Sequence, residues 1–352
     1  MSLTVLSVAY PLAPVSPDSV GGAEQILSAL DRALVADGHR SIVIACAGSG
    51  VAGELIAMPA ETGPLDEGAK ARAQARHREA VAWVLAHHAV DVVHLHGIDF
   101  SAYLPASGPT LVSLHLPLAW YPRTALQAGR DDLWLCPVSE SQAAEAPPGV
   151  RLRPPIPNGV DVDGFAGHAA RRNFALVLGR ICPEKGIHLA IDAARAAAMP
   201  LVIGGQVYPY AAHEAYFRDE IVPRLDPRRR FAGPLNLARK RRFLRAARCL
   251  LVPSLAPETS SLVAMEALAA GAPVIAFPNG ALPEVIEHGR TGFLVNDVAG
   301  MAEAIGWADE IDPDTCRAAA RDRFSRQTMV ERYFAAYREL AALGRPRLRS
   351  AS

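Results

Sequence analysis

The chain has 352 residues, of which half are apolar and a fifth are charged. This composition excludes a disordered or fibrous chain and is typical of a soluble globular protein. The 36 basic and 36 acidic side chains give a formal net charge of zero, so we expect no nucleic-acid partner. A chain of this length predicts two domains.

The cysteines and the N-terminus predict the cellular location. Five cysteines are scattered along the chain, and no two stand at metal-ligand spacing. Their odd number and spacing favour a reduced, cytoplasmic protein. The first residues lead directly into an expected strand without the features of a signal peptide, and no apolar run approaches the length of a membrane-spanning helix.

The first half of the chain alternates short β-rich runs with longer helical patterns. Predicted strands cover residues 4–9, 41–46, 91–96, 110–115 and 134–138. Predicted helices at 23–37 and 69–89 fit between them. Strands separated by segments of helical length predict a parallel sheet that helices cover on both faces.

A proline-rich connector at residues 146–159 interrupts this alternation and cannot be helical. We place the linker between two domains here, with residues 1–157 in the first and 158–327 in the second. The alternation then restarts, with predicted strands at 174–178, 201–203, 230–232, 249–253, 274–277 and 292–295. Both halves are therefore expected to be doubly wound α/β domains.

The C-terminal part is predicted to be helical at residues 299–308, 313–324 and 328–343. A basic segment at 345–352 follows without periodicity, and we expect it to be a frayed tail.

A glycine-rich run, Gly48-Ser49-Gly50-Val51-Ala52-Gly53, matches the dinucleotide-binding pattern G-x-G-x-x-G. That pattern normally joins the first strand of a domain to a long helix. Here it follows the second predicted strand, and the next residues, 54–59, are too few for such a helix. The sequence therefore favours a flexible loop over a dinucleotide site.

Two other glycine-containing loops follow first strands. Gly21 and Gly22 begin a predicted helix and either form a plain turn or let a ligand approach the backbone closely. In the second domain, Gly179-Arg180 and Lys185-Gly186 flank a loop at a strand end, where open parallel sheets bind ligands. Arg180 can bind a phosphate with two parallel hydrogen bonds and Lys185 can add a second charge, so together they favour a diphosphate site.

The stretch from Pro257 to Ala276 holds two carboxylates eight positions apart, Glu258 before a helical run and Glu266 inside it. Thr259, Ser260 and Ser261 are all good helix N-caps, and the amides that follow them would be free donors. Such a helix start attracts anions, phosphates above all.

Histidines at strand ends suggest two kinds of site. His94, His96 and His115 could form a metal site, but no further ligand stands at the required spacing, so we expect no metal. His94 is better explained as a strand residue held by hydrogen bonds. His115 begins an aromatic loop at the edge of the expected cleft, where a sugar-binding role and a structural role are equally favoured.

Two basic stretches raise the question of a membrane. The helix at 69–89 carries Lys70, Arg72, Arg76, His77 and Arg78 beside apolar side chains, which suits either an anionic membrane surface or, more simply, packing on the sheet. The run Arg239-Lys240-Arg241-Arg242 is expected to be the solvated face of a helix.

In order and spacing, these motifs resemble glycosyltransferase family 4, the retaining nucleotide-sugar transferases with the GT-B fold of two facing Rossmann-like domains. The resemblance covers most of the chain and lies in these motifs: Gly21-Gly22-Ala23-Glu24, Asp91-Val92-Val93-His94, Ile156-Pro157-Asn158-Gly159-Val160-Asp161, Gly179-Arg180 through Lys185-Gly186, the E-x7-E pair Glu258 and Glu266, Gly271-Ala272-Pro273-Val274-Ile275, Phe277-Pro278-Asn279-Gly280 to Pro283-Glu284-Val285-Ile286, and Gly289-Arg290-Thr291-Gly292-Phe293-Leu294.

The resemblance implies a role for each matching residue. Arg180 and Lys185 match the positions that hold the donor diphosphate, Glu258 the one that contacts the donor sugar, and Glu266 the one that takes the ribose hydroxyls. His115 resembles the family's sugar-contacting histidine. The implied catalytic residues are His115, Arg180, Lys185 and Glu258; the implied donor-binding residues are Gly21, Gly22, Gly179, Arg180, Lys185, Glu258, Thr259, Ser260, Ser261, Leu262 and Glu266.

The resemblance also implies the reaction and the partners. A sugar would pass from a nucleoside-diphosphate sugar, such as a UDP-sugar or GDP-sugar, to a hydroxyl of a glycan, lipid or small molecule, without a metal or another cofactor. Peripheral contact with the inner membrane face is compatible with it. Two alternatives stay open: an epimerase or hydrolase of nucleotide sugars on the same fold, and a non-catalytic protein that binds sugar nucleotides.

Two positions depart from the family pattern. Ser260-Ser261 replaces the usual Phe-Gly after the first glutamate. A glycine lets a ligand approach the backbone closely, and the serine puts that approach in doubt. Leu116 follows His115 where several members carry a polar residue, so acceptor contacts cannot be carried over. The family further implies that the last helix, 328–344, crosses back to pack on the first domain.

Overall fold

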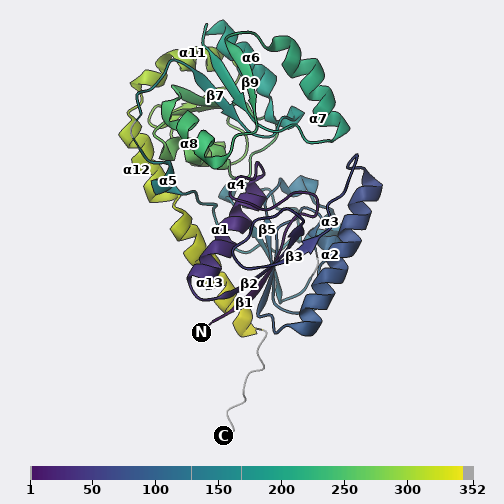
Figure 1. The fold of residues 1–352 in the computed structure, drawn as a ribbon. Helices are drawn as coiled ribbons and strands as arrows, with labels where there is room; N and C mark the ends of the chain where they lie inside the picture. The colour runs from purple at the N-terminus through teal and green to yellow at the C-terminus, as the bar shows by residue number, and fades with distance from the viewer. Residues whose placement is uncertain (1, 128, 168, 344–352) are drawn as a thin grey trace.

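The structure, a computed structural model, describes residues 2–127, 129–167 and 169–343. Two six-stranded sheets form the framework, one in each half of the chain, and all neighbouring strands are parallel (Figure 1). The predicted α/β architecture of two Rossmann-like domains is therefore confirmed. The basic segment 345–352, predicted to be frayed, lies outside the described residues.

The first sheet has the strand order β3-β2-β1-β4-β5-β6. Its strands are β1 Thr4–Val8, β2 Arg40–Cys46, β3 Glu54–Met58, β4 Val92–Leu95, β5 Thr110–Leu114 and β6 Leu133–Pro137. Successive side chains of β1 enter different clusters: Val5 joins one with Ile26, while Leu6 joins another with Val84. Both faces are buried, which explains why the strands read as apolar runs.

The second sheet repeats this topology, with the order β12-β11-β10-β7-β8-β9. Its strands are β7 Ala175–Leu178, β8 Leu201–Gly204, β9 Arg229–Gly233, β10 Cys249–Val252, β11 Val274–Ala276 and β12 Gly292–Leu294. In each sheet the order reverses next to the first strand of its domain, and ligands of such sheets bind outside the carboxyl ends at this reversal.

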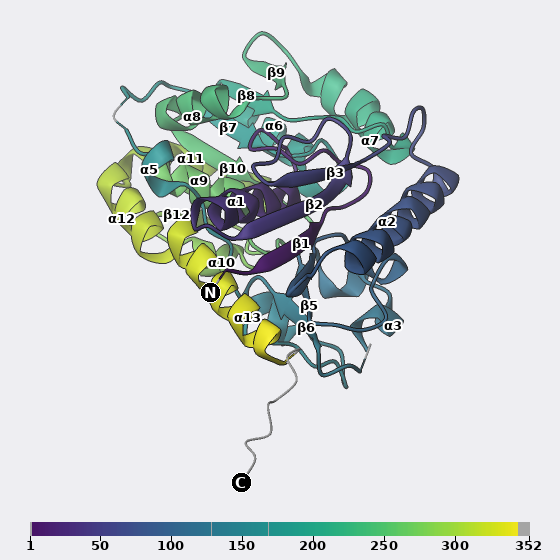
Figure 2. The same cartoon turned by 60° about the horizontal axis from the view of Figure 1, so that its bottom comes forward.

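The α-helices lie in the connections between strands and at the C-terminal end (Figures 1 and 2). They are α1 Gly22–Ala36, α2 Glu67–His87, α3 Arg123–Leu126, α4 Glu140–Ala144, α5 Val162–Phe165, α6 Ile187–Ala196, α7 Ala211–Tyr216, α8 Leu237–Ala246, α9 Leu262–Ala269, α10 Leu282–Val285, α11 Val298–Trp307, α12 Pro313–Arg323 and α13 Arg326–Leu343. Shorter helical turns are η1 Phe100–Ala102, η2 Leu118–Trp120, η3 Pro183–Lys185, η4 Phe217–Ile221, η5 Val222–Arg224 and η6 Ala308–Glu310. No helix in the described ranges is both long and apolar enough to cross a bilayer.

Helix α13 follows the second domain in sequence but packs beside α1 on the first sheet (Figure 2). Two buried tyrosines fix it there. The Tyr337 hydroxyl lies 2.7 Å from His94 Nδ1, and the Tyr333 hydroxyl lies 2.8 Å from Ser113 Oγ, which also contacts His94 Nε2 at 2.8 Å. His94 is thus a strand residue held by hydrogen bonds, as predicted, and both of its ring nitrogens are occupied.

The chain passes between the domains twice, and the two passages are hydrogen-bonded to each other. The amide of Val160 donates to Phe324 O at 2.8 Å, and the amide of Arg326 donates to Val160 O at 3.0 Å. Gly159 lies against this contact: a Cβ there would stand 2.5 Å from Ser325 O. Only glycine allows the two segments to approach so closely.

Strand β3 was missed in the sequence, where residues 54–59 were considered only as a helix that is too short. The segment is half-exposed at the edge of the sheet, so its pairing with β2 decides its structure rather than its own pattern. The glycine-rich run before it is a loop, as predicted. Its amides at Ala52 and Gly53 donate to the Asp31 carboxylate at 2.6 and 3.1 Å, which already occupies the donors a phosphate would need.

We predict that Gly159→Ala lowers the free energy of unfolding by about 1–3 kcal/mol, because the new methyl group forces the two passages apart. Chemical denaturation followed by circular dichroism measures the change. Gly50→Ala is the matched control, since nothing lies within 4 Å of a Cβ at that position and its φ is not positive. Equal stabilities for the two variants would contradict the proposed close packing.

Candidate active site

A cavity of about 490 Å³ lies between the two domains. The first domain contributes the segments that follow β1, β4 and β5, and the second domain contributes those that follow β7, β8 and β10. All these segments leave the carboxyl ends of parallel strands, so the cavity occupies the position at which such sheets bind ligands. Of the predicted site residues, Glu266 is the one that does not line it.

Arg180 lies on the wall of this cavity, two residues after β7. Within the described ranges its guanidinium has neither an ion-pair partner nor a hydrogen-bond partner. Its charge nevertheless reaches Glu24 and Glu258, whose pKa values it helps to lower. A guanidinium with free donors in a cavity is suited to bidentate binding of a phosphate or carboxylate.

Lys185 and Glu258 form an ion pair beside Arg180, with Lys185 Nζ 2.6 Å from Glu258 Oε1. The Ser254 hydroxyl donates to the same carboxylate oxygen. Burial alone would raise the pKa of Glu258, but Lys185, Ser254 and Arg180 together lower it below its ordinary value. Glu258 is therefore ionised at neutral pH, and its carboxylate can accept hydrogen bonds from sugar hydroxyls.

The backbone around Glu258 is held by the loop that follows β11. The amide of Ala281 donates to Glu258 O at 2.7 Å. Gly280 has φ +62, and a Cβ there would stand 2.2 Å from Glu258 O. Gly280 thus allows this loop to pack closely against the backbone of Glu258.

Helix α9 begins at the cavity with an unusual N-cap. Ser261 adopts the left-handed conformation, with φ +58, and makes no side-chain capping bond. The hydroxyls of Ser260 and Ser261 are both buried and have no hydrogen-bond partner among the described residues. Free hydroxyls beside a helix N-terminus suit an anionic ligand. Ser261 therefore adopts a backbone conformation that favours glycine, at some cost in strain.

Glu266 lies behind this helix start rather than on the cavity wall. Its Oε1 is 2.5 Å from Lys240 Nζ, while its Oε2 is buried without a partner. The prediction that residues 239–242 form only a solvated face is wrong for Lys240, which is 9% exposed. Glu266 lines neither this cavity nor the one that adjoins it, and its contact with a ribose stays a prediction.

His115 lies at the end of β5, on the first-domain wall of the cavity. Its Nε2 is 3.0 Å from Nδ1 of His96, and its carbonyl accepts a 2.8 Å hydrogen bond from the Thr259 hydroxyl. Burial lowers the pKa of His115 to about 4 and that of His96 well below its ordinary value. Both imidazoles are therefore neutral at pH 7.

The glycines at the start of α1 complete the opposite wall. Gly21 is the N-cap of α1, and Gly22 lies against Leu262 of the second domain at the cavity wall, with a Cβ position 3.4 Å from Leu262 Cδ1. The predicted first-domain and second-domain residues are thus brought together. Two further bonds join the walls: Tyr10 and Tyr210 through their hydroxyls at 3.3 Å, and the Leu237 amide, which donates to Asp18 at 2.6 Å.

Glu24 was not predicted as a site residue, although it belongs to the motif Gly21-Gly22-Ala23-Glu24. It lies in the first turn of α1, and its carboxylate lies so close to Gly21 that a Cβ there would clash with it. Burial raises its pKa, whereas its own backbone amide and Arg180 lower it. The absence of a side chain at Gly21 therefore leaves room for this carboxylate.

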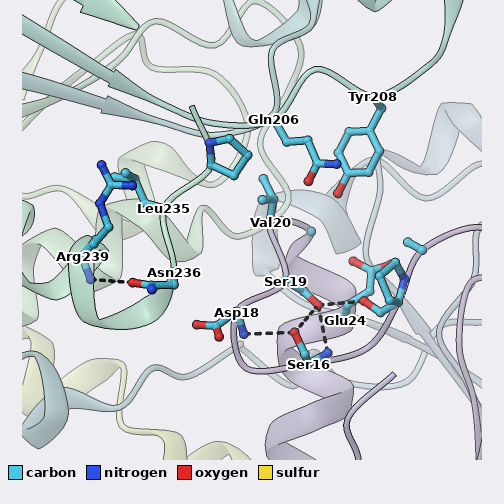
Figure 3. Close-up of a pocket in the computed structure, with 14 residues that line it drawn as sticks. Ser16, Asp18, Ser19, Val20, Glu24, Gln206, Tyr208, Leu235, Asn236 and Arg239 are labelled. Carbon is cyan, nitrogen blue, oxygen red and sulfur yellow. Dashed lines mark hydrogen bonds between the residues drawn. The ribbon is translucent and has the colours of Figure 1, made fainter. Parts of the chain in front are cut away.

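A second cavity of about 400 Å³ adjoins the first and shares Gly21, Glu24 and Tyr208 with it. Figure 3 shows it between the loop that carries Ser16, Asp18 and Ser19 and the second-domain segments with Gln206, Leu235, Asn236 and Arg239. The amide of Arg239 donates to the Asn236 side chain at 2.9 Å, which caps α8 at the edge of this space.

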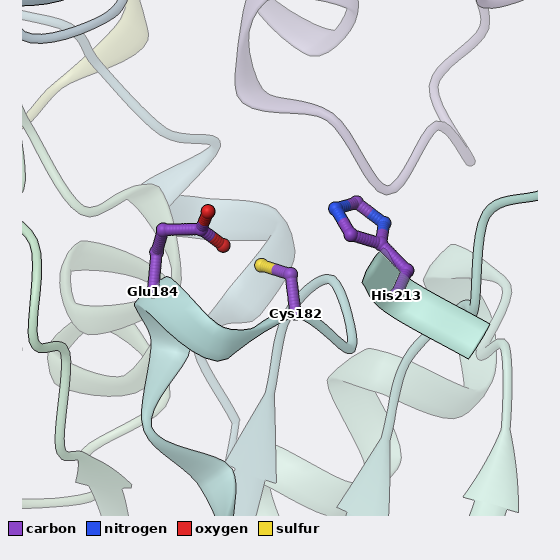
Figure 4. A group of neighbouring side chains, drawn as sticks. All are labelled: Cys182, Glu184 and His213. Carbon is purple, nitrogen blue, oxygen red and sulfur yellow. The ribbon is translucent and has the colours of Figure 1, made fainter. Parts of the chain in front are cut away.

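A group that could hold a metal ion was also missed in the sequence, because its members are far apart in the chain. Cys182, Glu184 and His213 place one ligand atom each within 4.8 Å of the others (Figure 4). Burial raises the pKa of the Cys182 thiol to about 11, so this ligand is protonated at neutral pH. Arg180 acts on all three groups with its positive charge, which further disfavours a cation.

Comparisons with known proteins bear on the class of protein. The family model "Glycosyl transferases group 1" matches residues 172–308, the part that contributes Arg180, Lys185 and Glu258. Phosphatidyl-myo-inositol mannosyltransferase of Mycobacterium tuberculosis is 29% identical over 316 residues, which cover 77% of this chain and 79% of that protein.

Solved structures extend the similarity to nearly the whole chain. AviGT4, a glycosyltransferase involved in avilamycin A biosynthesis, is 26% identical with a TM-score of 0.72, covering 97% of this chain and 98% of its own. Anabaena HepE in complex with UDP-glucose has a TM-score of 0.73 at 19% identity, covering 96% of this chain and all of its own; at this identity it supports the fold alone.

Fold and cleft together define an enzyme of the GT-B glycosyltransferase class. In sequence, the matched domain and the relatives make the chain similar to glycosyltransferases of the family 4 type.

We predict that Ser261→Gly raises the free energy of unfolding by about 1 kcal/mol, because glycine adopts the left-handed conformation without strain. The same change weakens binding of nucleoside diphosphates, because a hydroxyl at the helix start is lost. Denaturation and calorimetric titration measure the two effects. Ala198→Gly is the control: Ala198 has φ +49 but lies outside the cavity wall, so stability rises and affinity stays unchanged. Unchanged affinity in Ser261→Gly would remove Ser261 from the site.

Proposed function

We propose that this glycosyltransferase moves a sugar from a nucleoside-diphosphate sugar to an acceptor hydroxyl with retention of anomeric configuration. The observation that carries the proposal is the unpaired Arg180 next to the Lys185–Glu258 ion pair and the free hydroxyls of Ser260 and Ser261. This arrangement offers cationic and hydroxyl donors for a diphosphate, and one carboxylate for a sugar.

In the proposed step, the bond between the anomeric carbon and the β-phosphate oxygen breaks. The acceptor oxygen forms its bond to the same carbon on the same face, and its proton passes to the departing diphosphate. The products are a glycoside and a nucleoside diphosphate. Because the leaving group gains negative charge, Arg180 and Lys185 bind the transition state more strongly than the donor and so accelerate the reaction. Retention rests on the family resemblance.

The donor is expected to lie across both cavities. Its sugar and diphosphate fit the larger one, where Glu258 and Arg180 stand, and its nucleoside fits the adjoining space near Gln206 and Asn236. HepE, which shares the fold, was solved with UDP-glucose, and the mycobacterial relative is a mannosyltransferase. A UDP-sugar or GDP-sugar is therefore the first donor to test.

Metal independence and the absence of a cofactor are part of the proposal. Arg180 and Lys185 supply the positive charge that a divalent ion would otherwise bring to the diphosphate. The cluster of Cys182, Glu184 and His213 is a poor cation site at neutral pH, because its thiol is protonated and Arg180 is near.

A cytoplasmic location with peripheral contact at the inner membrane face stays a prediction. Helix α2 exposes Trp83 and Leu85, which suits an interface, but Arg72 and Arg76 both pair with Glu61 and so contribute little free charge. Co-sedimentation of the wild-type protein with vesicles of anionic lipid tests this contact.

We predict that Arg180→Ala and Lys185→Ala each lower the turnover of the preferred donor by on the order of 100-fold or more, because charge on the leaving group is no longer stabilised. Release of nucleoside diphosphate and the mass of the glycosylated product are measured in the presence of EDTA. Arg218→Ala is the control, since Arg218 is exposed, lies outside both cavities and pairs with the adjacent Asp219.

Several results of this assay would contradict the proposal. Intact transfer in both variants would show that Arg180 and Lys185 do not stabilise the leaving diphosphate. Release of free sugar without acceptor would identify a hydrolase, and loss of wild-type transfer in EDTA would establish a metal requirement. Stabilisation by nucleoside diphosphates without any turnover would instead indicate a binding protein.

A further inference from the structure

Apart from Gly21, Gly22 and His115, the first-domain half of the larger cavity holds no residue that is implied to bind the donor. It is formed by Tyr10, Leu12, Ile98, Leu116 and Trp120, together with the neutral His96 and His115. The second-domain half holds the residues proposed to bind the donor. An acceptor must reach the anomeric carbon from this first-domain side.

Trp120 is an exposed aromatic residue of this half. It ends the short turn η2, and 39% of its side chain is exposed, although it lines the cavity. An exposed aromatic face on the wall of a cavity offers a platform for a flat apolar surface. The C–H face of a pyranose ring is such a surface, while its hydroxyls point sideways.

The loop that carries Trp120 is fixed by hydrogen bonds from buried side chains. Gln142 is buried, and its Nε2 donates to Leu114 O at 2.7 Å and to Leu116 O at 2.8 Å. The amide of Leu116 donates to the buried Tyr121 hydroxyl at 3.3 Å. The platform therefore exists before ligand arrives, which lowers the entropic cost of binding.

The charge of this half opposes an anionic ligand. Among the described first-domain residues on the cavity wall there is no lysine or arginine, Glu24 is the one carboxyl side chain, and His96 and His115 are neutral. Lys185 is already paired with Glu258, and Arg180 is the residue proposed above to bind the donor diphosphate. Arg123, three residues beyond Trp120, lies on α3 outside the cavity wall.

We propose that the acceptor is an uncharged sugar ring, presented as a glycan or glycoside, which stacks on Trp120, and that phosphorylated acceptors are rejected. This inference rests on the proposed transfer reaction and names its substrate class. A phosphate in this half would lose its hydration and face Glu24 and apolar side chains without a free cation. An uncharged ring loses little hydration on its apolar face and keeps its hydroxyls available to Glu24 and His115.

The test uses p-nitrophenyl glycosides of glucose, mannose, galactose and N-acetylglucosamine, the matching sugar 1-phosphates, and vesicles that contain phosphatidylinositol. Transfer from the preferred donor is followed by product mass, and binding of the same soluble compounds by saturation-transfer NMR. The neutral glycosides are expected to bind and to be glycosylated at least about tenfold faster than the sugar phosphates, since these lack a free cation.

Variants locate the effect. Trp120→Ala is expected to raise the KM for the neutral glycoside by about tenfold with donor KM unchanged, while Trp120→Phe keeps most of the affinity. Trp307→Ala is the control, because Trp307 is 47% exposed at the end of α11, outside both cavities.

Preferred transfer to sugar phosphates or to lipid vesicles, binding of neither soluble class, or an unchanged acceptor KM in Trp120→Ala would each overturn the inference. Failure of the proposed transfer reaction would give a different result: no nucleoside diphosphate would stabilise the wild-type protein against unfolding.

Discussion

The unpaired guanidinium of Arg180 is the feature on which the site depends. It stands at a cavity wall next to a lysine that already has a carboxylate partner, and within the described residues no side chain forms an ion pair or hydrogen bond with it. Such a charge is costly to hold in a closed cleft. A ligand anion that supplies the missing charge therefore stabilises the closed arrangement as well as binding to it, which couples donor binding to the contacts between the domains.

The fold keeps these charges in place from both sides. The carboxyl ends of two sheets with the same topology face the cavity, so the helix starts at Gly22 and Leu262 meet across it. Helix α13 is bonded to the first sheet through His94 and Ser113, and the two chain passages are bonded to each other at Val160. The hydrogen bond from Thr259 to the His115 carbonyl then links the walls directly. The same contacts between the domains therefore stabilise the fold and position the site.

Much of the site could be predicted because its residues stand next to strand ends. In a parallel sheet such ends meet at one edge, so Arg180, Lys185, Glu258 and His115 could be brought together from the order of the motifs alone. The two-domain α/β fold followed from the alternation of strands and helices. The family resemblance then supplied roles that the spacing alone does not give.

What the sequence did not reveal depends on contacts between distant segments. Strand β3 forms because β2 offers an edge, and Lys240 is buried because Glu266 lies beneath it. The closeness of Cys182 to His213 arises from the packing of α7 on the loop after β7. Ser261 takes the backbone conformation of the glycine it replaces, although no local pattern predicts a left-handed serine.

The central claim is that the cavity binds a diphosphate through Arg180 and Lys185. Calorimetric titration of the wild-type protein with UDP, GDP and ADP and with the corresponding monophosphates tests it most directly. At least one diphosphate is expected to bind at least about tenfold more tightly than its monophosphate, because only the diphosphate brings a second charged group to Arg180 and Lys185. Equal affinity for mono- and diphosphates, or no binding of any diphosphate, would contradict the account.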